Sequence, residues 1–317
     1  MTESEVVLQQ LITGLSNGMI IALIALGYTM VYGVVELINF AHGDLFMLGS
    51  FLALTLIGLF GVNPATVHAV HFVLLFVLVP SFCALVNWIV DRFTYRSLRN
   101  APRLAPLVSA IGVSFIFLNL GLFWGGLPLD VFDFGRSAAS PKDFPALIPY
   151  HNLLPLGSAI EFTLKDLVVV AVTLPFMFAL TLFVKFSRLG KAMRAVAQNP
   201  SAAQLMGIDV DRVIGITFIV GGALGGVASV IYALYNNTVH FQMGFRVGID
   251  AFAAAVLGGI GNLPGAVLGG LVIGIVRALS DQYIATSWTN VVVFSILVLV
   301  LIFRPAGLLG AHHREKV

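Results

Sequence analysis

Charged residues are scarce in this chain. Asp, Glu, Lys and Arg make up 10% of its 317 residues, whereas soluble domains carry about 25%. Hydrophobic residues make up 59%, so the composition excludes an ordinary water-soluble domain and indicates a membrane protein with several spans. The formal net charge of +2 gives no sign of nucleic-acid binding.

The sequence also lacks the motifs of catalysis and metal binding. Its single cysteine, Cys83, lies inside an apolar run, so this chain alone can form neither a disulfide framework nor a cysteine metal site. HExxH, GxSxG and clustered histidines are absent. A Walker A motif is missing too, because Gly190 and Lys191 lack both the earlier glycine and a following Ser or Thr. We therefore expect no catalytic residue, metal or cofactor on this chain, and any ATP that drives it would bind another subunit.

Long apolar runs dominate what is present. A membrane-spanning helix needs about 20 mostly apolar residues, and this criterion predicts an all-α polytopic membrane protein with about eight transmembrane segments in one domain, residues 1–317. The predicted spans are 6–35, 45–62, 71–90, 104–124, 166–186, 213–235, 250–280 and 288–303.

Two breaks interrupt this pattern, near residues 36–45 and 258–265. The first is rich in polar and small residues, and the second contains glycines and a proline, which disfavour helix. Irregular backbone at membrane depth persists only inside protein or beside a wet cavity, so both breaks are predicted as discontinuous helices on a translocation path. The candidate path residues are Asn39, His42, Gly43, Asp44, Asp250, Gly258, Gly259, Gly261 and Asn262.

A structural role competes with the path role at these positions. For Asp44 and Asp250 we favour capping of the half-helix that follows, because a carboxylate accepts hydrogen bonds from free amides at a helix N-terminus. His42 fits a buried histidine and a path residue equally well. Arg277 and Asp281 lie four residues apart and are predicted to form an ion pair.

Basic residues indicate the orientation. They gather in the predicted loop 91–103 and in residues 187–212 and the C-terminal tail, so the positive-inside rule places all three in the cytoplasm. The loop carries Arg92, Arg96, Arg99 and Arg103, and the tail carries Arg304, Arg314 and Lys316. The proline-rich insert 125–165 belongs outside. Splitting the seventh span at 258–265 into two crossings reconciles the tail with this arrangement, and the N-terminus then lies outside.

Small residues spaced four apart predict close helix packing. We expect most of these pairs to pack inside the chain, with dimerisation as the alternative. A short echo between residues 38–41 and 249–252 also leaves an internal repeat open. The pairs are Gly14/Gly18, Gly221/Gly225, Gly222/Gly226, Gly265/Gly269 and Gly270/Gly274.

The polar stretch 187–212 predicts two short helices. The first is amphipathic and basic. In the second, Asn199 is suited to cap the N-terminus, Pro200 to the first helical position and Gly207 to the left-handed residue that ends the helix. Such a short helix is either part of a solvated loop or a small projection that docks on a partner.

Residues 201–207, SAAQLMG, resemble the EAA-xxx-G motif of ABC importer permeases, with Ser201 where the motif has Glu. The runs LGYTMVYG (26–33), INFAHGD (38–44), AAVLGGIGN (254–262) and FRPAGLLG (303–310) resemble the LivH family of branched-chain amino-acid importer permeases, and the resemblance covers residues 8–310. Asp44 stands where many members carry Glu. By this resemblance, the ATPase-coupling residues are Asn199, Pro200, Ser201, Ala202, Ala203, Gln204, Leu205, Met206 and Gly207.

The resemblance further implies the partners and the location. These are a second, LivM-like permease, two ABC ATPases that bind ATP and Mg, and a periplasmic binding protein. The expected location is the bacterial inner membrane, with the N-terminus and the insert 125–165 periplasmic and the C-terminus cytoplasmic. Urea, short amides or other amino acids are the alternative substrates within the superfamily. A stand-alone secondary transporter or channel is the alternative of another class.

Overall fold

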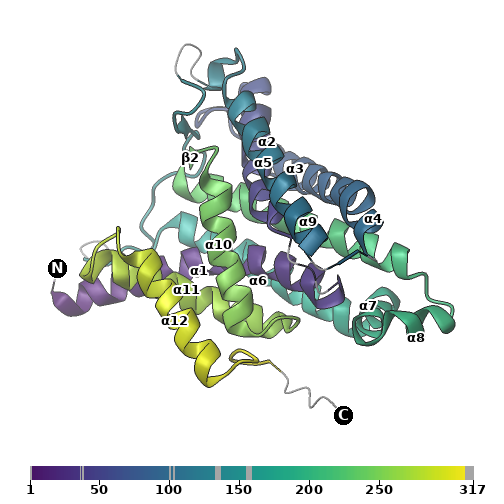
Figure 1. Ribbon diagram of the computed structural model, residues 1–317. Coiled ribbons are helices and arrows are strands. Elements are labelled where there is room, and N and C mark those ends of the chain that lie inside the picture. The colour runs from purple at the N-terminus through teal and green to yellow at the C-terminus, as the bar shows by residue number, and fades with distance from the viewer. Residues whose placement is uncertain are drawn as a thin grey trace.

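The computed structural model describes residues 2–35, 37, 39–99, 101–102, 104–132, 137–154 and 159–310, and these form a helical bundle (Figure 1). Seven described helices are long and apolar enough to cross a membrane, which confirms the predicted all-α polytopic class. The elements are α1 (Glu3–Val35), α2 (Ala41–Leu59), α3 (Ala69–Val90), η1 (Asp91–Tyr95), α4 (Arg96–Leu98), α5 (Leu104–Gly125), η2 (Asp130–Phe132), β1 (Lys142–Asp143), α6 (Leu164–Phe186), α7 (Arg188–Gln198), α8 (Pro200–Leu205), α9 (Val210–Asn236), β2 (Thr238–Val239), α10 (Met243–Gly258), α11 (Leu263–Tyr283) and α12 (Thr289–Phe303).

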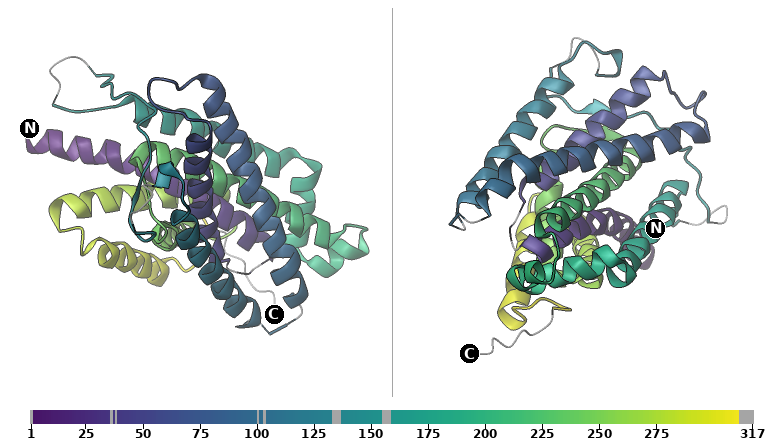
Figure 2. Two further views of the ribbon diagram at one scale, coloured as in Figure 1. Left: turned by 90° about the horizontal axis from the view of Figure 1, so that it is seen from above. Right: turned by 90° about the vertical axis from the view of Figure 1, so that its right-hand side faces the viewer.

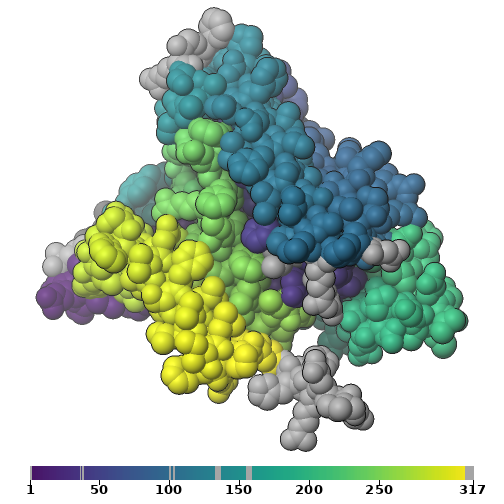
Figure 3. All heavy atoms as spheres, viewed as in Figure 1, coloured from purple at the N-terminus to yellow at the C-terminus, as the bar shows by residue number. Residues whose placement is uncertain are grey.

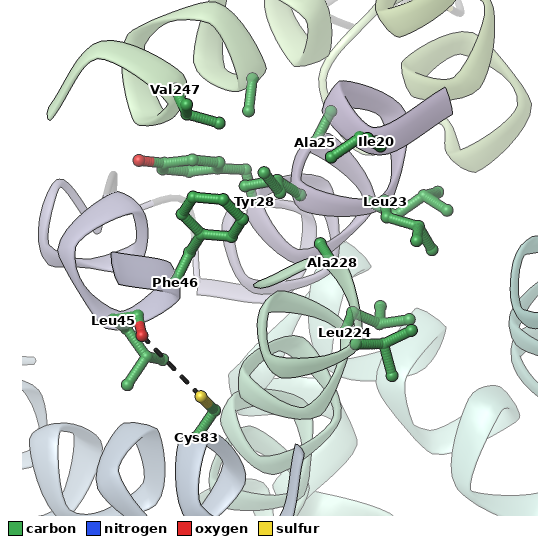
Figure 4. Packing of buried hydrophobic residues seen from close by; sticks show 14 of the residues in the cluster. Ile20, Leu23, Ala25, Tyr28, Leu45, Phe46, Cys83, Leu224, Ala228 and Val247 are labelled. Carbon is green, nitrogen blue, oxygen red and sulfur yellow. Dashed lines mark hydrogen bonds between the residues drawn. The ribbon is translucent and has the colours of Figure 1, made fainter. Parts of the chain in front are cut away.

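The helices divide into an inner and an outer group. In the most apolar 18-residue stretch of each helix, 72% of residues are buried in α1, 78% in α2 and 78% in α9. The corresponding shares are 22% in α3, 17% in α5 and 22% in α6. Apolar side chains on the outer helices therefore face outward, as they do against lipid. Figure 4 shows the inner packing, where Tyr28 of α1 lies between Phe46 of α2 and Val247 of α10. In Figure 3, α12 covers the surface beside α10.

Glycine allows the inner helices to approach closely. At the α1–α11 crossing, a Cβ added to Gly18 would lie 2.9 Å from Cα of Leu271, and one on Gly14 would lie 2.8 Å from Cα of Ile275. Gly222 and Gly226 of α9 contact α3 in the same way. All five predicted glycine pairs pack against other parts of this chain, so internal packing is confirmed as their use here.

The main contacts are reciprocal between the two halves of the chain. Helix α1 packs chiefly on α11, and α9 chiefly on α3, while α2 meets α10. At the meeting of α2 and α10, Gly43 faces Gly244 and Gly248. Phe40 and Phe252, which belong to the two echo segments, have ring centroids 6.0 Å apart. The internal repeat itself stays a prediction.

The bundle has two distinct ends, which the left panel of Figure 2 separates. We call the end with α7 and α8 the α8 end. The other is the insert end, because β2, just after α9, pairs antiparallel with β1 of the segment between α5 and α6, through Lys142↔Val239 and Asp143↔Thr238. Helix α1 begins at the insert end and runs toward the α8 end (Figure 2).

Several boundaries differ from the sequence predictions. Residues 91–98, predicted as the start of a loop, continue α3 as η1 and α4. The seventh span is two helices, and the first of these begins at Met243, before the predicted start at residue 250. The split itself agrees with the prediction. Helix α10 has 16 residues and is therefore about 24 Å long. Arg103, Arg314 and Lys316 lie outside the described residues.

Candidate functional site

Helices α7 and α8 form a small projection with well-defined caps. The Ser187 side chain accepts a hydrogen bond from the Gly190 amide at 2.8 Å, and Asn199 accepts one from the Ala202 amide at 2.9 Å. Gly207 has the left-handed φ of +83° predicted for it. The local structure of 187–207 is therefore the one that the sequence predicts.

The projection is anchored on one side and free on the other. Met193, Val196 and Ala203 are buried, whereas Leu205 is 89% exposed and Met206 is 83% exposed. Two adjacent large apolar side chains are thus presented to the surroundings at the outer edge of α8. Exposure of this kind at a polar end of the molecule is typical of a protein interaction site.

Ion pairs join the start of α9, at the base of this projection, to Arg96 of α4 and to Arg99 just after it. Arg96 pairs with Asp211 of α9 at 2.6 Å, and Arg99 pairs with Asp91 at 2.7 Å and also with Asp211. Sequence analysis used Arg96 and Arg99 only for orientation and missed these contacts, since Asp211 lies more than a hundred residues away.

A cavity of about 840 Å³ separates the projection from the first break. Pro200 and Gln204 of α8 line one side, and Val34, Val35 and Leu37 at the end of α1 line another. Movement of α8 into or out of this space would therefore act on the segment that joins α1 to α2.

Asn39 in the first break is held by hydrogen bonds. Its Nδ2 donates to Asn87 Oδ1 at 3.2 Å, and its Oδ1 accepts from the Tyr95 hydroxyl at 3.1 Å. Asn87 in turn donates to the Phe218 carbonyl at 2.7 Å. Asn39 thus joins the break to α3 and η1, and through Asn87 to α9, and its side chain is buried in this conformation.

His42 and Asp44 are buried polar groups in the first turns of α2. The His42 ring packs edge-on against Tyr28, with centroids 4.8 Å apart, in a slot between Gly27 and Gly225. Neither His42 nitrogen has a hydrogen-bond partner among the described residues. Asp44 accepts from Ser114 of α5 through Oδ2, and its Oδ1 has no partner in the same part of the chain.

The capping predictions for both aspartates are wrong. Helix α2 begins at Ala41, ahead of the expected start near Leu45, and its N-cap Phe40 has no side-chain hydrogen bond. Asp44 therefore lies within the first turn, bonded to another helix. Asp250 lies in the middle of α10, because that helix begins at Met243. Burial among neighbouring helices, and not a helix terminus, determines the surroundings of both carboxylates.

The second break is held by the segment that follows α12, residues 304–310. Gly259 and Gly261 have φ of +107° and +84°, which favours glycine. Asn262 caps α11 by accepting from the Gly265 amide at 3.0 Å. The segment after α12 covers the break, since the Leu309 amide donates to the Gly258 carbonyl at 3.0 Å and Asn262 Nδ2 donates to the Leu309 carbonyl at 2.6 Å. Here Asn262 has a capping role.

Asp250 lines a second cavity, of about 670 Å³, among α1, α9, α10 and α11 at the insert end. Its partner is Arg277 of α11, which also lines the cavity. The predicted pairing of Arg277 with Asp281 is therefore wrong, because Asp281 accepts from Thr289 instead. Sequence analysis also missed Arg246, although its spacing of four from Asp250 places both on one face of a helix.

The candidate path residues consequently fall into separate groups. His42, Gly43 and Asp44 lie in the packed interior, Gly258, Gly259, Gly261 and Asn262 lie at the α8 end, and Asp250 alone lines the cavity at the insert end. Among the described residues, no group of three or more His, Cys, Asp or Glu could hold a metal ion.

Comparison with known proteins gives consistent relatives. Residues 10–301 match the model of the family described as branched-chain amino acid transport system / permease component. The LivH permease protein of Escherichia coli K12 is 39% identical over 314 residues, 98% of this chain and 97% of that protein. BraD of Pseudomonas aeruginosa is 38% identical over 315 residues, 98% of each.

One further relative is a LivM permease, which matches over a shorter stretch of the chain. The probable LivM permease protein of Methanocaldococcus jannaschii is 30% identical over 134 residues, 38% of this chain and 39% of that protein. No solved structure matches this chain. Since the family model and the full-length relatives agree, the chain belongs to the family of permease components of branched-chain amino acid transport systems.

Proposed function

We propose that this chain is one permease subunit of an ATP-driven importer for branched-chain or related neutral amino acids. The observation that carries the proposal is the capped projection α7–α8, with Leu205 and Met206 exposed at its edge in a chain of this permease family. A docking helix is needed where the chain that spans the membrane does not itself bind ATP, because the force must then pass between subunits.

The remaining parts of the importer are partners of this chain in the proposal. Two ABC ATPases bind ATP and Mg and dock on α8. A LivM-like permease completes the path, and a periplasmic binding protein delivers the substrate. The relation between this family's LivH and LivM proteins, visible in the match to a LivM permease over part of the chain, fits a pair of unlike but related permeases.

The orientation follows from charge. Basic residues gather at the α8 end, and by the positive-inside rule this end faces the cytoplasm. In this proposal α1, α2, α3 and α5 cross the membrane before the insert, α6 crosses between the insert and the projection, and α9, α10, α11 and α12 cross after the projection. These crossings of the described helices leave the N-terminus periplasmic and the C-terminus cytoplasmic in a bacterial inner membrane. The basic residues concerned are Arg92, Arg96, Arg99, Arg188, Lys191, Arg194 and Arg212.

The cavity between α8 and the end of α1 suggests how ATP is used. When the ATPases move α8, the cavity lined by Gln204 and Val35 changes shape, and the connection from α1 to α2 moves with it. That connection carries Asn39 and leads into Gly43, where α2 crosses α10. Motion at the cytoplasmic end is thereby passed to the helices that enclose the other cavity.

The test is a charged substitution at the exposed edge of α8. Leu205→Asp should abolish leucine uptake by the assembled importer and release or uncouple the ATPases, while the permease pair still assembles. Ala203 is less suitable because it is buried, at 5% exposed, so a bulky residue there would disrupt the projection itself.

Leu59→Asp is the matched control. Leu59 is also exposed, at 67%, but it is the last residue of α2, at the insert end, so this variant should leave ATPase binding unchanged. Full coupling in Leu205→Asp would remove the proposal. Leucine uptake in vesicles that lack the ATPases, driven by an ion gradient, would instead favour a stand-alone secondary transporter.

A further inference from the structure

The cavity at the insert end has the size of a small-molecule site. Its volume is about 670 Å³, and ligand pockets commonly span about 300–1,000 Å³. Ile20, Ile21 and Val247 are among its apolar lining residues, and polar and charged groups make up most of the rest. In the proposed orientation the cavity lies in the periplasmic half of the bundle, on the side where substrate would arrive.

Two pairs of oppositely charged residues line this cavity, and in each pair one residue comes from α10 and the other from α11. We call them the inner layer, whose two residues bind each other, and the outer layer, whose two residues do not. Helices α10 and α11 are joined by the short break at 259–262 and run antiparallel. In the inner layer, Asp250 of α10 binds Arg277 of α11, which also donates to Asn290 at 3.2 Å. This pair is satisfied internally and leaves little charge for a ligand.

The outer layer lies one helical turn nearer the insert end on both helices. Arg246 precedes Asp250 by four residues on α10, and Asp281 follows Arg277 by four on α11, so each lies about 6 Å farther out. The signs are reversed relative to the inner layer. Both residues line the cavity.

The outer layer is open. Arg246 forms no hydrogen bond or ion pair with any residue in the described part of the chain. Asp281 accepts from Thr289 through Oδ1, and no described residue donates to its Oδ2. The Arg246 guanidinium and the Asp281 carboxylate therefore line one cavity from α10 and α11 without binding each other. The positive charge of Arg246 also attracts the nearby Asp250 carboxylate, with which it forms no hydrogen bond.

We propose that this open layer binds the zwitterionic backbone of an α-amino acid, with the carboxylate on Arg246 and the ammonium on Asp281. A guanidinium holds a carboxylate through two parallel hydrogen bonds, and the ligand's apolar side chain lies against Ile20, Ile21 and Val247. This inference deepens the proposed function and rests on it. A neutral amide or urea would leave both charges of the layer unpaired, so the site selects against them.

The test uses a thiol at the cavity edge in the assembled importer. Gln242 is exposed and lines the cavity, and the native Cys83 is buried, so Gln242→Cys places one reactive thiol on this chain. A water-soluble maleimide labels this thiol, and mass spectrometry of this subunit measures the rate of labelling. The rate should fall when leucine is added. Leucinol, which lacks the carboxylate, and 4-methylpentanoate, which lacks the ammonium, should give no protection.

Variants of Arg246 test whether protection of the Gln242→Cys thiol by leucine depends on the outer layer. Arg246→Gln in the Gln242→Cys background should raise the half-protecting leucine concentration roughly ten- to hundredfold, the effect of losing a hydrogen bond to a charged group. Arg246→Lys should restore part of it. Ala65→Cys, in the exposed loop after α2, should be labelled at one rate with or without leucine.

The outcomes separate this site from the proposed function. Equal protection by leucine and both analogues, or no change in Arg246→Gln, would overturn the site even if leucine uptake is normal. Protection by an amino acid with a charged side chain, in an importer that takes up no neutral amino acid, would keep the site and overturn the proposed function.

Discussion

Arg277 of α11 and Asp250 of α10 form a buried ion pair, with Nη1 2.6 Å from Oδ1 and 2.7 Å from Oδ2. Their side chains are only 11% and 9% exposed. The pair joins α10 and α11, the helices on either side of the second break. The open layer of Arg246 and Asp281 lies one helical turn nearer the insert end.

Removal of one partner of this pair should be more harmful than removal of both. Arg277→Met leaves a buried carboxylate without its cation, which costs about 3–5 kcal/mol. Arg277→Met combined with Asp250→Leu removes both charges, and the double variant should recover most of that loss. Thermal unfolding of the purified protein in detergent measures the difference, and a double variant less stable than Arg277→Met would contradict the expectation.

A methyl group at the α1–α11 crossing should destabilise the protein. In Gly18→Ala the new Cβ would meet Cα of Leu271 at 2.9 Å and the Gly270 carbonyl oxygen at 3.0 Å. Backbone atoms cannot turn aside, so we expect a loss of about 1–3 kcal/mol, seen as a lower unfolding temperature.

Gly112→Ala provides the control for this crossing. Gly112 lies in α5, and no atom lies within 4 Å of an added Cβ. The better helix propensity of alanine should make this change neutral or stabilising, by up to about 1 kcal/mol. Equal destabilisation by both variants would show that close approach at Gly18 is not the cause.

The hydrogen bond from Ser114 to Asp44 should matter more than an ordinary serine contact. Ser114→Ala leaves the buried Asp44 carboxylate without the one described donor that it has, at a cost of about 1–3 kcal/mol. Ser81→Ala is the matched control, because Ser81 is exposed and donates only to the Val77 carbonyl of its own helix. Denaturant unfolding that places the two variants together would refute the prediction.

The two aspartates at the α8 end should differ in their contribution to stability. Asp91 is 5% exposed and Asp211 is 44% exposed. Asp91→Asn weakens a buried pair with Arg99 and should cost several kcal/mol with little dependence on salt. Asp211→Asn should cost less than about 1 kcal/mol, and less still at high salt. Unfolding at low and high ionic strength tests both statements, and a larger loss at Asp211 would reverse them.

Local chemistry made some parts of this protein predictable. Caps at Asn199 and Gly207, the apolar runs and the glycine spacing act over a few residues, so the projection, the spans and the close helix crossings followed from the sequence. The two breaks were predictable for the same reason, because glycine, proline and polar residues disfavour helix wherever they stand.

The partners of the buried charges were not predictable. Asp250 was expected to cap a helix and Arg277 to pair with Asp281, since both expectations use neighbours in the sequence. The structure instead starts α10 at Met243 and brings α11 beside it, which places Arg277 against Asp250 and leaves Asp281 and Arg246 facing the cavity.

The sequence by itself thus determined the class of protein, the spans and the capped projection, because hydropathy and capping are local properties of the chain. Only the tertiary structure decided which charges are satisfied and which remain open. Pairing depends on helices that meet across as many as 272 residues, as in the hydrogen bond from Gln10 to Gln282, and no local pattern specifies that register.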